Sequence, residues 1–479
     1  MKLKNSLVRP DNLNTGQREC VSLVADFLKS DKTSFTISGH AGTGKSYITK
    51  YIIQRLLQNK KVTVSAPTHK AVRVIEKFTG KKGHTLHSLH GLRPNYSLED
   101  FNIDKIKFES IGNIKFNEYN VIFIDEASMI NHDLKRLNDV RAKQYKTKLI
   151  YLGDAYQLPP VNENKPSDVF TDVDNKYILT EVVRQDKDNP LLDLFTILRS
   201  DIDTNRSDFL SYIYNNKSVI GNGGYRLLNL YEFKELIKEL FTSDEFKSNI
   251  DFIRYAAYTN DSITYWNKFI RNLLFPRAEL LVEGDILTGY KTIVDDNNTP
   301  IITNSTDYKV LKAEKRLSDD KFSSYYVDLV DLSSFNTVSV SIVDHTDKSF
   351  VNYYKILNNL HRIAYYAPSS ERGAKYKNYF NFKNTHLSMV KFGLKDKSSN
   401  RERGWVDREL NYGYGITVHK LQGSTIENIA LNGANICYYD DNSNTPRRNT
   451  LNNPNVISLR NRLLYTGLTR VSDIAYIYL

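Results

Sequence analysis

The chain has 479 residues, 40% hydrophobic and 25% charged, which excludes wholesale disorder, a collagen helix and a coiled-coil rod, and predicts two to four domains. It carries 66 lysines and arginines against 55 acidic residues, and the net charge of +11 is compatible with a polyanionic partner. The two cysteines, Cys20 and Cys437, lie far apart, so a reducing compartment is favoured. No run of about 18 apolar residues occurs, so we expect a cytoplasmic protein without a membrane partner.

The first 200 residues alternate short apolar runs with stretches of helical periodicity. Residues 35–38, 62–66, 121–124 and 149–152 resemble buried strands, and residues 45–58 carry apolar side chains at helical spacing. Strands that are apolar throughout, separated by helices, are typical of a parallel sheet covered on both faces. The sequence therefore predicts an α/β fold.

Changes in composition and hydrophobic patterning along the chain predict its domain organisation. Residues 86–118 interrupt the alternation and predict an insertion, and residues 440–456, rich in Asn, predict a surface loop. A β-rich stretch begins near residue 285, and the alternation returns near residue 414. The predicted domains are a first domain over 1–188, a second domain over 189–284 and 401–479, and an insertion over 285–400.

A phosphate-binding loop is the strongest motif in the chain. Residues 39–46 read Gly-His-Ala-Gly-Thr-Gly-Lys-Ser and lie between a predicted strand and a predicted helix, the context that this motif requires. Backbone N–H groups at a helix N-terminus bind phosphate, Lys45 would reach the β- and γ-phosphates, and Ser46 would coordinate Mg²⁺. A chance glycine-rich turn is the alternative. The predicted ATP-binding residues are Gly39, His40, Ala41, Gly42, Thr43, Gly44, Lys45 and Ser46.

Three further polar residues follow predicted strands. Asp125 and Glu126 come directly after residues 121–124, at the strand end where ligands of such sheets lie. We expect Asp125 to hold Mg²⁺ and Glu126 to act as general base for water, although an ordinary strand end gives the same pattern. Gln157 follows the next strand and is predicted to sense the γ-phosphate and the attacking water.

Together these motifs resemble those of superfamily 1 helicases of the RecD-like branch, and the resemblance spans residues 13–479. It implies that Gln17 reads adenine, that Gln422 and Gly423 contact ATP, and that Arg184 and Arg470 reach the γ-phosphate. With Lys45, Glu126 and Gln157, these two arginines form the predicted catalytic set. The implied DNA-contacting residues are Pro67, Thr68, His69, His87, Asn260, Thr417, His419 and Lys420.

The resemblance also implies a fold and an activity. The fold is two RecA-like motor domains, with a wedge-like insertion on the first and an SH3-like β-insertion on the second. The activity is Mg²⁺-dependent ATP hydrolysis that drives 5′-to-3′ movement on single-stranded DNA and unwinds duplex DNA. The implied partners are single-stranded DNA, forked or tailed duplex DNA, and a single-strand-binding protein or replisome component. We expect a monomer, in the host cytoplasm if the chain is phage-encoded.

The physics of hydrolysis agrees with this expectation. Charge that develops on the γ-phosphoryl group must be neutralised as the transition state forms. Arg184 and Arg470 lie far apart in sequence, so both can reach one phosphate only if two domains close on ATP. Nucleotide state would then be coupled to domain closure.

Several alternatives stay open from the sequence. The chain could displace bound proteins without much unwinding, act as a nucleotide-gated single-strand-binding switch, or move on RNA. His84, His87 and His90 recur at three-residue spacing, but no acidic or cysteine cluster accompanies them to favour a metal site. Phe101, Phe108 and Phe116 are candidate duplex-splitting residues, with core packing as the alternative.

Overall fold

The computed structural model describes residues 13–92, 113–161, 163–181, 189–221, 223–295, 299–395, 402–438 and 454–479. The chain divides into two compact units, one combining residues 1–266 with 415–479 and the other comprising 267–414. Within the described ranges, no helix is long and apolar enough to cross a bilayer.

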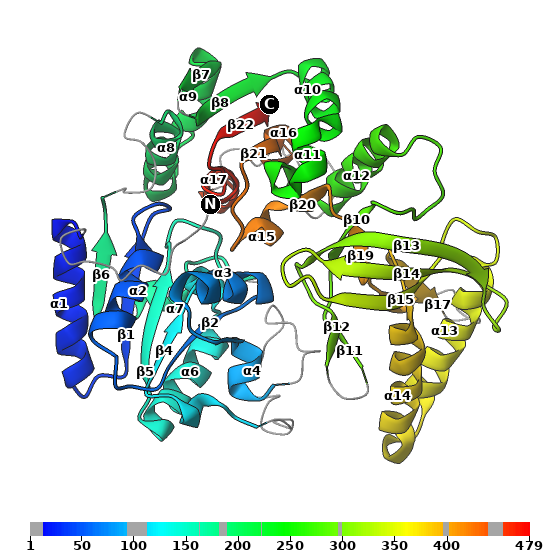
Figure 1. Cartoon of the computed structure of the whole chain (residues 1–479), viewed down its shortest axis with the longest axis horizontal. Coiled ribbons are helices and arrows are strands. Elements are labelled where there is room, and N and C mark those ends of the chain that lie inside the picture. Colours follow the sequence, from blue (N-terminus) through cyan, green and yellow to red (C-terminus); the bar gives the residue numbers. More distant parts are fainter. Residues whose placement is uncertain are drawn as a thin grey trace. The chain divides into compact units, whose positions relative to one another are not determined.

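The first unit contains two separate sheets, and the first of them is parallel throughout (Figure 1). Its strands in spatial order are β3 (Gly83–Thr85), β2 (Val62–Ala66), β4 (Val121–Ile124), β5 (Lys148–Gly153), β1 (Ser34–Gly39) and β6 (Lys176–Leu179). The accompanying helices are α1 (Thr15–Lys29), α2 (Lys45–Arg55), α3 (His69–Thr79), α4 (Leu86–His90), η3 (Phe116–Glu118), η4 (Ala127–Met129), α6 (His132–Tyr145) and α7 (Asp168–Thr171).

Apolar side chains of this sheet pack into two hydrophobic cores. Phe123, Ile150 and Leu152 pack with residues of α1 and α2, whereas Ile122, Ile124 and Leu149 pack with residues of α4 and α6. Successive side chains of a strand point to opposite faces, so strands that are apolar at every position need helices on both sides. The sequence showed this pattern, and the predicted α/β fold is confirmed.

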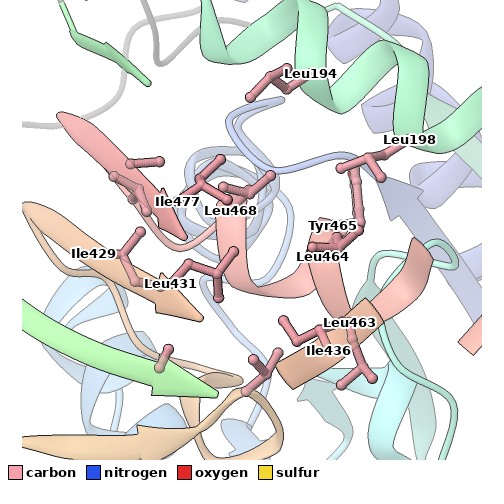
Figure 2. Close-up of a cluster of buried hydrophobic side chains, with 14 of the residues drawn as sticks. Leu194, Leu198, Ile429, Leu431, Ile436, Leu463, Leu464, Tyr465, Leu468 and Ile477 are labelled. Carbon is pink, nitrogen blue, oxygen red and sulfur yellow. The ribbon is translucent and has the colours of Figure 1, made fainter. Parts of the chain in front are cut away.

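The second sheet of this unit is parallel except for its edge strand β7. Its strands in spatial order are β20 (Gly415–Thr417), β9 (Ile253–Ala257), β21 (Asn428–Asn432), β22 (Ile474–Tyr478), β8 (Gly223–Leu228) and β7 (Ser218–Gly221). The helices are α8 (Leu191–Thr204), α9 (Asp208–Asn215), α10 (Leu230–Thr242), α11 (Asp244–Ser248), η5 (Ile250–Phe252), α12 (Asn260–Leu274), α15 (Val418–Leu421), α16 (Gly433–Tyr438) and α17 (Pro454–Leu468). Figure 2 shows its core, where Leu194 and Leu198 of α8 and Leu464 and Leu468 of α17 lie with strand residues such as Leu431.

The second unit is built on a mainly antiparallel sheet. Its strands in spatial order are β16 (His386–Leu387), β15 (Thr337–Val343), β14 (Ser323–Asp331), β13 (Asp307–Leu317), β10 (Ile286–Gly289) and β19 (Leu410–Tyr412). Two small pairs add β11 (Ile293–Val294) with β12 (Pro300–Ile302), and β17 (Phe392–Lys395) with β18 (Glu402–Val406). The predicted β-rich insertion is confirmed, and its SH3-like character stays a prediction.

This unit is longer than the predicted insertion over 285–400. Strand β19 pairs with β10 in the insertion sheet, so the residues just after 400 join this unit and not the second sheet of the first unit. Two helices, α13 (Phe350–Tyr366) and α14 (Ser369–Thr385), pack against each other and form a helical hairpin (Figure 1). A buried ion pair joins Lys383 of α14 to Glu409.

A second buried ion pair fixes the start of this unit. Arg271 of α12 donates from Nε and Nη2 to the Asp285 carboxylate at 2.9 Å. The same carboxylate accepts hydrogen bonds from the Tyr414 hydroxyl at 2.9 Å and from the Val282 backbone N–H at 3.0 Å. Asp285 is therefore hydrogen-bonded on several sides, as a buried polar group must be if its burial is not to destabilise the fold.

Candidate nucleotide site and nucleic-acid interface

The phosphate-binding loop joins β1 to α2. Gly42 and Gly44 have φ values of 84° and 85°, a region that other residues rarely occupy, and Gly44 is the N-cap of α2. A Cβ atom at Gly39 would lie 2.6 Å from Thr43 Oγ1, so the loop closes too tightly there for a side chain. The glycines are thus required by the backbone path that aims N–H groups at an anion.

Lys45 begins α2 and points back into the loop. Its Nζ atom donates to the Gly39 carbonyl at 2.6 Å and to the His40 carbonyl at 3.0 Å. Burial lowers the pKa of Lys45, with Asp154 and Asp125 opposing that shift. The ammonium is therefore held beside the loop, where a phosphate would meet it.

The two predicted carboxylates follow β4. The Asp125 backbone N–H donates to the Ser65 carbonyl of β2 at 2.8 Å, and Asp125 Oδ1 accepts from the Glu126 N–H at 2.9 Å. Burial, reinforced by the charge of Glu126, raises the pKa of Asp125 to about 6. Glu126 has a φ of 52°, which for a non-glycine residue is a strained backbone often found at functional sites.

Arg470 contacts two other predicted catalytic residues, Glu126 and Gln157. It follows α17 and so belongs to the second sheet, whereas Glu126 and Gln157 follow strands of the first. Its guanidinium donates to both Glu126 carboxylate oxygens at 3.1 and 3.2 Å, and to Gln157 Oε1 at 2.6 Å. Residues 344 positions apart in sequence thereby meet at one point.

The loop after β5 is held by α17 through contacts that the sequence analysis missed. Arg462 donates from Nη1 to the Ala155 carbonyl at 2.6 Å and to the Gln157 carbonyl at 2.9 Å. The Tyr465 hydroxyl donates to Asp154 Oδ2 at 2.8 Å. A guanidinium facing backbone carbonyls leaves no acidic partner in the sequence to reveal it, so only the packing of α17 shows this role.

Gln17 and Gly423 border the same loops. Gln17 forms a capping box with Asn14 at the start of α1, and its Nε2 atom donates to the Thr43 carbonyl at 3.2 Å. Gly423 has a φ of 76°, and a Cβ there would lie 3.1 Å from the Ala71 Cβ and 3.8 Å from Glu126 Cγ. The left-handed backbone and the close approach to Ala71 therefore favour glycine here, and the segment after α15 lies within van der Waals reach of Glu126.

The chemistry of the site fits Mg²⁺ and an anionic nucleotide. Among the predicted site residues that the structure describes, three buried nitrogens have no hydrogen-bond partner: His40 Nδ1, Gln422 Nε2 and Arg470 Nε. Burial lowers the pKa of His40 to about 4, so its imidazole is neutral near neutral pH. Orphaned donors beside a tight glycine loop suit phosphate oxygens, and the adjacent carboxylates of Asp125 and Glu126 suit a hard divalent cation.

Predicted DNA-contacting residues of the first sheet follow the neighbouring strands β2 and β3. Pro67 and Thr68 lie directly after β2, and Thr68 Oγ1 caps α3 by accepting the Ala71 N–H at 3.2 Å. His69 begins α3, and His87 lies in α4, where burial lowers its pKa to about 4. The phosphate-binding loop and the carboxylates follow β1 and β4, so the same edge of the sheet carries both groups.

The second sheet repeats this arrangement. Thr417 ends β20 and His419 and Lys420 lie in α15, while Asn260 begins α12 shortly after the adjacent strand β9. The His419 ring stacks on Tyr258, with centroids 5.9 Å apart and planes at 27°. Each sheet thus presents its predicted DNA residues at the carboxyl ends of two adjacent strands.

Some predicted residues fall elsewhere. Arg184, Phe101 and Phe108 lie outside the described residues. Phe116 is buried and stacks on His90 with centroids 4.8 Å apart, so it belongs to the core.

Two of the three histidines in the series form hydrogen bonds to neighbouring side chains. His84 shares a hydrogen bond with the Tyr119 hydroxyl at 2.9 Å, and His90 shares one with Asn138 at 2.8 Å. No group of three potential metal-ligating His, Cys, Asp or Glu residues occurs in the described part of the chain.

Comparison with known proteins agrees with this geometry. An AAA domain family model matches residues 12–211. The ATP-dependent DNA helicase dda of Enterobacteria phage T4 is 27% identical over 295 residues, which cover 58% of this chain and 61% of the phage protein. The RecBCD enzyme subunit RecD of Buchnera aphidicola is 24% identical over 493 residues, covering 96% of this chain and 72% of that subunit.

A solved structure is also similar. The crystal structure of Pif1 helicase from Candida albicans matches with a TM-score of 0.47 and 18% identity, covering 97% of this chain and 94% of that chain. An AAA domain family model thus matches part of the chain, and the chain is similar to superfamily 1 helicases of the RecD-like branch, which confirms the resemblance that the motifs predicted.

Proposed function

We propose that the chain is an ATP-dependent DNA helicase that moves along single-stranded DNA. The observation that carries this proposal is the meeting of Arg470, from the second sheet, with Glu126 and Gln157 of the first. A hydrolase whose nucleotide is contacted by residues from two sheets can convert hydrolysis into relative movement of those sheets. The similarity to the ATP-dependent DNA helicase dda of phage T4 supports the same activity.

The residues have separate tasks at the proposed ATP site. The loop over residues 39–46 binds the phosphates, and Lys45 and Arg470 supply positive charge where negative charge develops. Glu126 accepts a proton from the attacking water, and Gln157 orients that water. Ser46 and Asp125 would hold Mg²⁺, which neutralises phosphate charge when it is bound.

In this proposal, the position of Arg470 determines when hydrolysis can begin. Its guanidinium now binds the carboxylate that must act as the base. The γ-phosphate of ATP is a second anion that competes for the same guanidinium. Transfer of Arg470 to that phosphate frees Glu126 to accept a proton, so hydrolysis would begin only when the second sheet has engaged the nucleotide.

Movement on DNA requires two grips. Thr68 and His69 contact the strand from the first sheet in this proposal, and Thr417 and His419 contact it from the second. Alternating grip during each ATP cycle would drive the chain along the strand. We infer 5′-to-3′ movement of a monomer on tailed or forked duplexes, with a single-strand-binding protein or replisome component as a candidate partner.

The test uses duplexes with one single-stranded tail. We expect single-stranded DNA to stimulate ATP hydrolysis, and unwinding to require a 5′ tail, ATP and Mg²⁺. Lys45→Ala is the matched inactive control, because it removes the fixed cation from the phosphate site. ATP hydrolysis without unwinding from either tail would favour a translocase, and unwinding from 3′ tails alone would overturn the proposed direction.

A further inference from the structure

The helical hairpin formed by α13 and α14 carries a run of aromatic rings that the motor does not account for. Tyr366, Tyr365, His361, Tyr376 and Phe380 follow one another with ring centroids 5.1, 6.1, 6.0 and 6.2 Å apart. The first three belong to α13 and the last two to α14, so the run crosses from one helix to the other. We call these five residues the aromatic ladder.

Three of the five ladder rings are exposed, whereas His361 is buried and Tyr376 is partly buried at the edge of the core of this unit. Tyr365, Tyr366 and Phe380 are 48%, 61% and 47% exposed. The hydrophobic core of this unit lies elsewhere on the same helices, where Tyr353, Leu357 and Tyr379 are buried against Phe322 and Val343. Three large rings left in solvent on one hairpin mark an interaction surface rather than a structural one.

The charges around the ladder are nearly all positive. The hairpin carries exposed or half-exposed Lys355, Arg362, Arg372, Lys375 and Lys377 against Glu371 as the sole acid over residues 350–385. Lys383 is already neutralised by its buried pair with Glu409. Five cations against one acid give this surface a charge of about +4, which favours a polyanionic ligand.

We propose that this hairpin is a second binding surface for single-stranded DNA, separate from the residues at the ends of β2 and β20. The exposed rings can stack on unstacked bases, and the lysines and arginines neutralise the backbone phosphates. Duplex DNA offers no unstacked bases to the rings, so a single strand is the ligand that uses both features. A long strand would then be held at two places on the chain.

The test measures binding of fluorescently labelled oligo(dT) of about 10 and about 40 nucleotides to the full chain without ATP. The variant Tyr365→Ala with Tyr366→Ala and Phe380→Ala removes the exposed rings from helical positions that tolerate alanine. Tyr231→Ala is the matched control, because Tyr231 is an exposed tyrosine of α10 beside Glu232.

We expect the triple variant to bind the long strand about 5-fold to 150-fold more weakly, as loss of even one stacked base would give, and to bind the short strand unchanged. A second variant, Arg362→Glu with Lys377→Glu, should make binding of the long strand less sensitive to salt. Its log–log salt slope should fall by about 0.7 for each phosphate that the variant no longer neutralises. Lys238→Glu on α10 is the matched charge control.

Equal affinity of the triple variant and the unmodified chain for the long strand would overturn the proposal. Equal weakening for both lengths would also overturn it, because the rings would then act through the motor surface or through folding. If the variant instead changes self-association in sedimentation while DNA affinity is kept, the ladder binds a second copy. Weak binding of the short strand by the unmodified chain would count against the proposed helicase function, not against the ladder.

Discussion

Two arginine–carboxylate pairs occupy opposite roles in the molecule. Arg271 and Asp285 are 7% and 0% exposed, and the carboxylate is also bonded by Tyr414 and by the Val282 N–H. Arg470 and Glu126 are 10% and 16% exposed, Arg470 Nε has no partner among the described residues, and Glu126 holds a left-handed backbone.

The difference distinguishes a structural pair from a functional one. A buried ion pair that is fully hydrogen-bonded has no free donor or acceptor for a ligand, and removing one member lowers the free energy of unfolding. A pair with an unsatisfied donor and a strained backbone keeps capacity for another anion. The first pair should therefore control stability, and the second should control turnover.

Arg470→Ala should cause the largest effect on activity. We expect kcat for ATP hydrolysis to fall by about 10³–10⁵, the range for an arginine that stabilises phosphoryl-transfer charge. The free energy of unfolding and DNA binding without nucleotide should change little. Steady-state hydrolysis and denaturant titration measure both, and a loss below about tenfold would make Arg470 a structural partner like Arg271.

Glu126→Gln should lower kcat by about 10²–10⁴, because the amide cannot accept a proton from water. Binding of a fluorescent ATP analogue should be retained, since the glycine loop and Lys45 are intact. Glu118→Gln is the control, as Glu118 is an exposed acid in the same domain. Full turnover by the glutamine variant would assign the general base to another residue.

Arg271→Ala should leave the chemistry intact but lower the free energy of unfolding of the second unit by about 3–5 kcal/mol, because Asp285 is left buried without its cation. Urea denaturation combined with limited proteolysis follows that unit. The double variant Arg271→Met with Asp285→Asn should recover much of the loss, since no unpaired charge remains. Destabilisation below about 1 kcal/mol would contradict the structural role.

Arg462→Ala should give the smallest change, a fall in kcat of about tenfold, equivalent to about 1.4 kcal/mol of barrier. The loop that carries Gln157 loses the donor to two of its carbonyls and with it a fixed position. Arg462→Lys should restore part of the activity, because an ammonium can still bond a carbonyl. An altered melting temperature with unchanged kcat would show that Arg462 serves stability alone.

The sequence predicted those parts of the site that are local in the chain. The loop over residues 39–46 and the carboxylates after β4 depend on neighbouring residues, so their spacing was enough. The contact of Arg470 with Glu126 depends on how two sheets pack, and no local pattern contains it. The same holds for Arg462, whose partners are backbone carbonyls.

The second unit was harder to predict for a related reason. Within α14 only Tyr379 and Lys383 are buried, so the sequence has no apolar stripe that would predict a helix of that length. Strand β19 is three residues long and pairs with β10, which lies more than a hundred residues earlier. Short strands whose partners are distant carry little periodicity, so the predicted end at residue 400 stopped before it.

The hydrogen bond from the Asp125 N–H to the Ser65 carbonyl has a mechanical consequence. Ser65 lies two residues before Pro67, where β2 gives way to the loop proposed to grip DNA. The proposed DNA-contacting loop and the carboxylates therefore follow adjacent, hydrogen-bonded strands of the same sheet. A force on DNA bound at this loop would therefore be transmitted directly to the carboxylates that act in hydrolysis. DNA could then set the rate of ATP hydrolysis without a longer chain of contacts between the two sites.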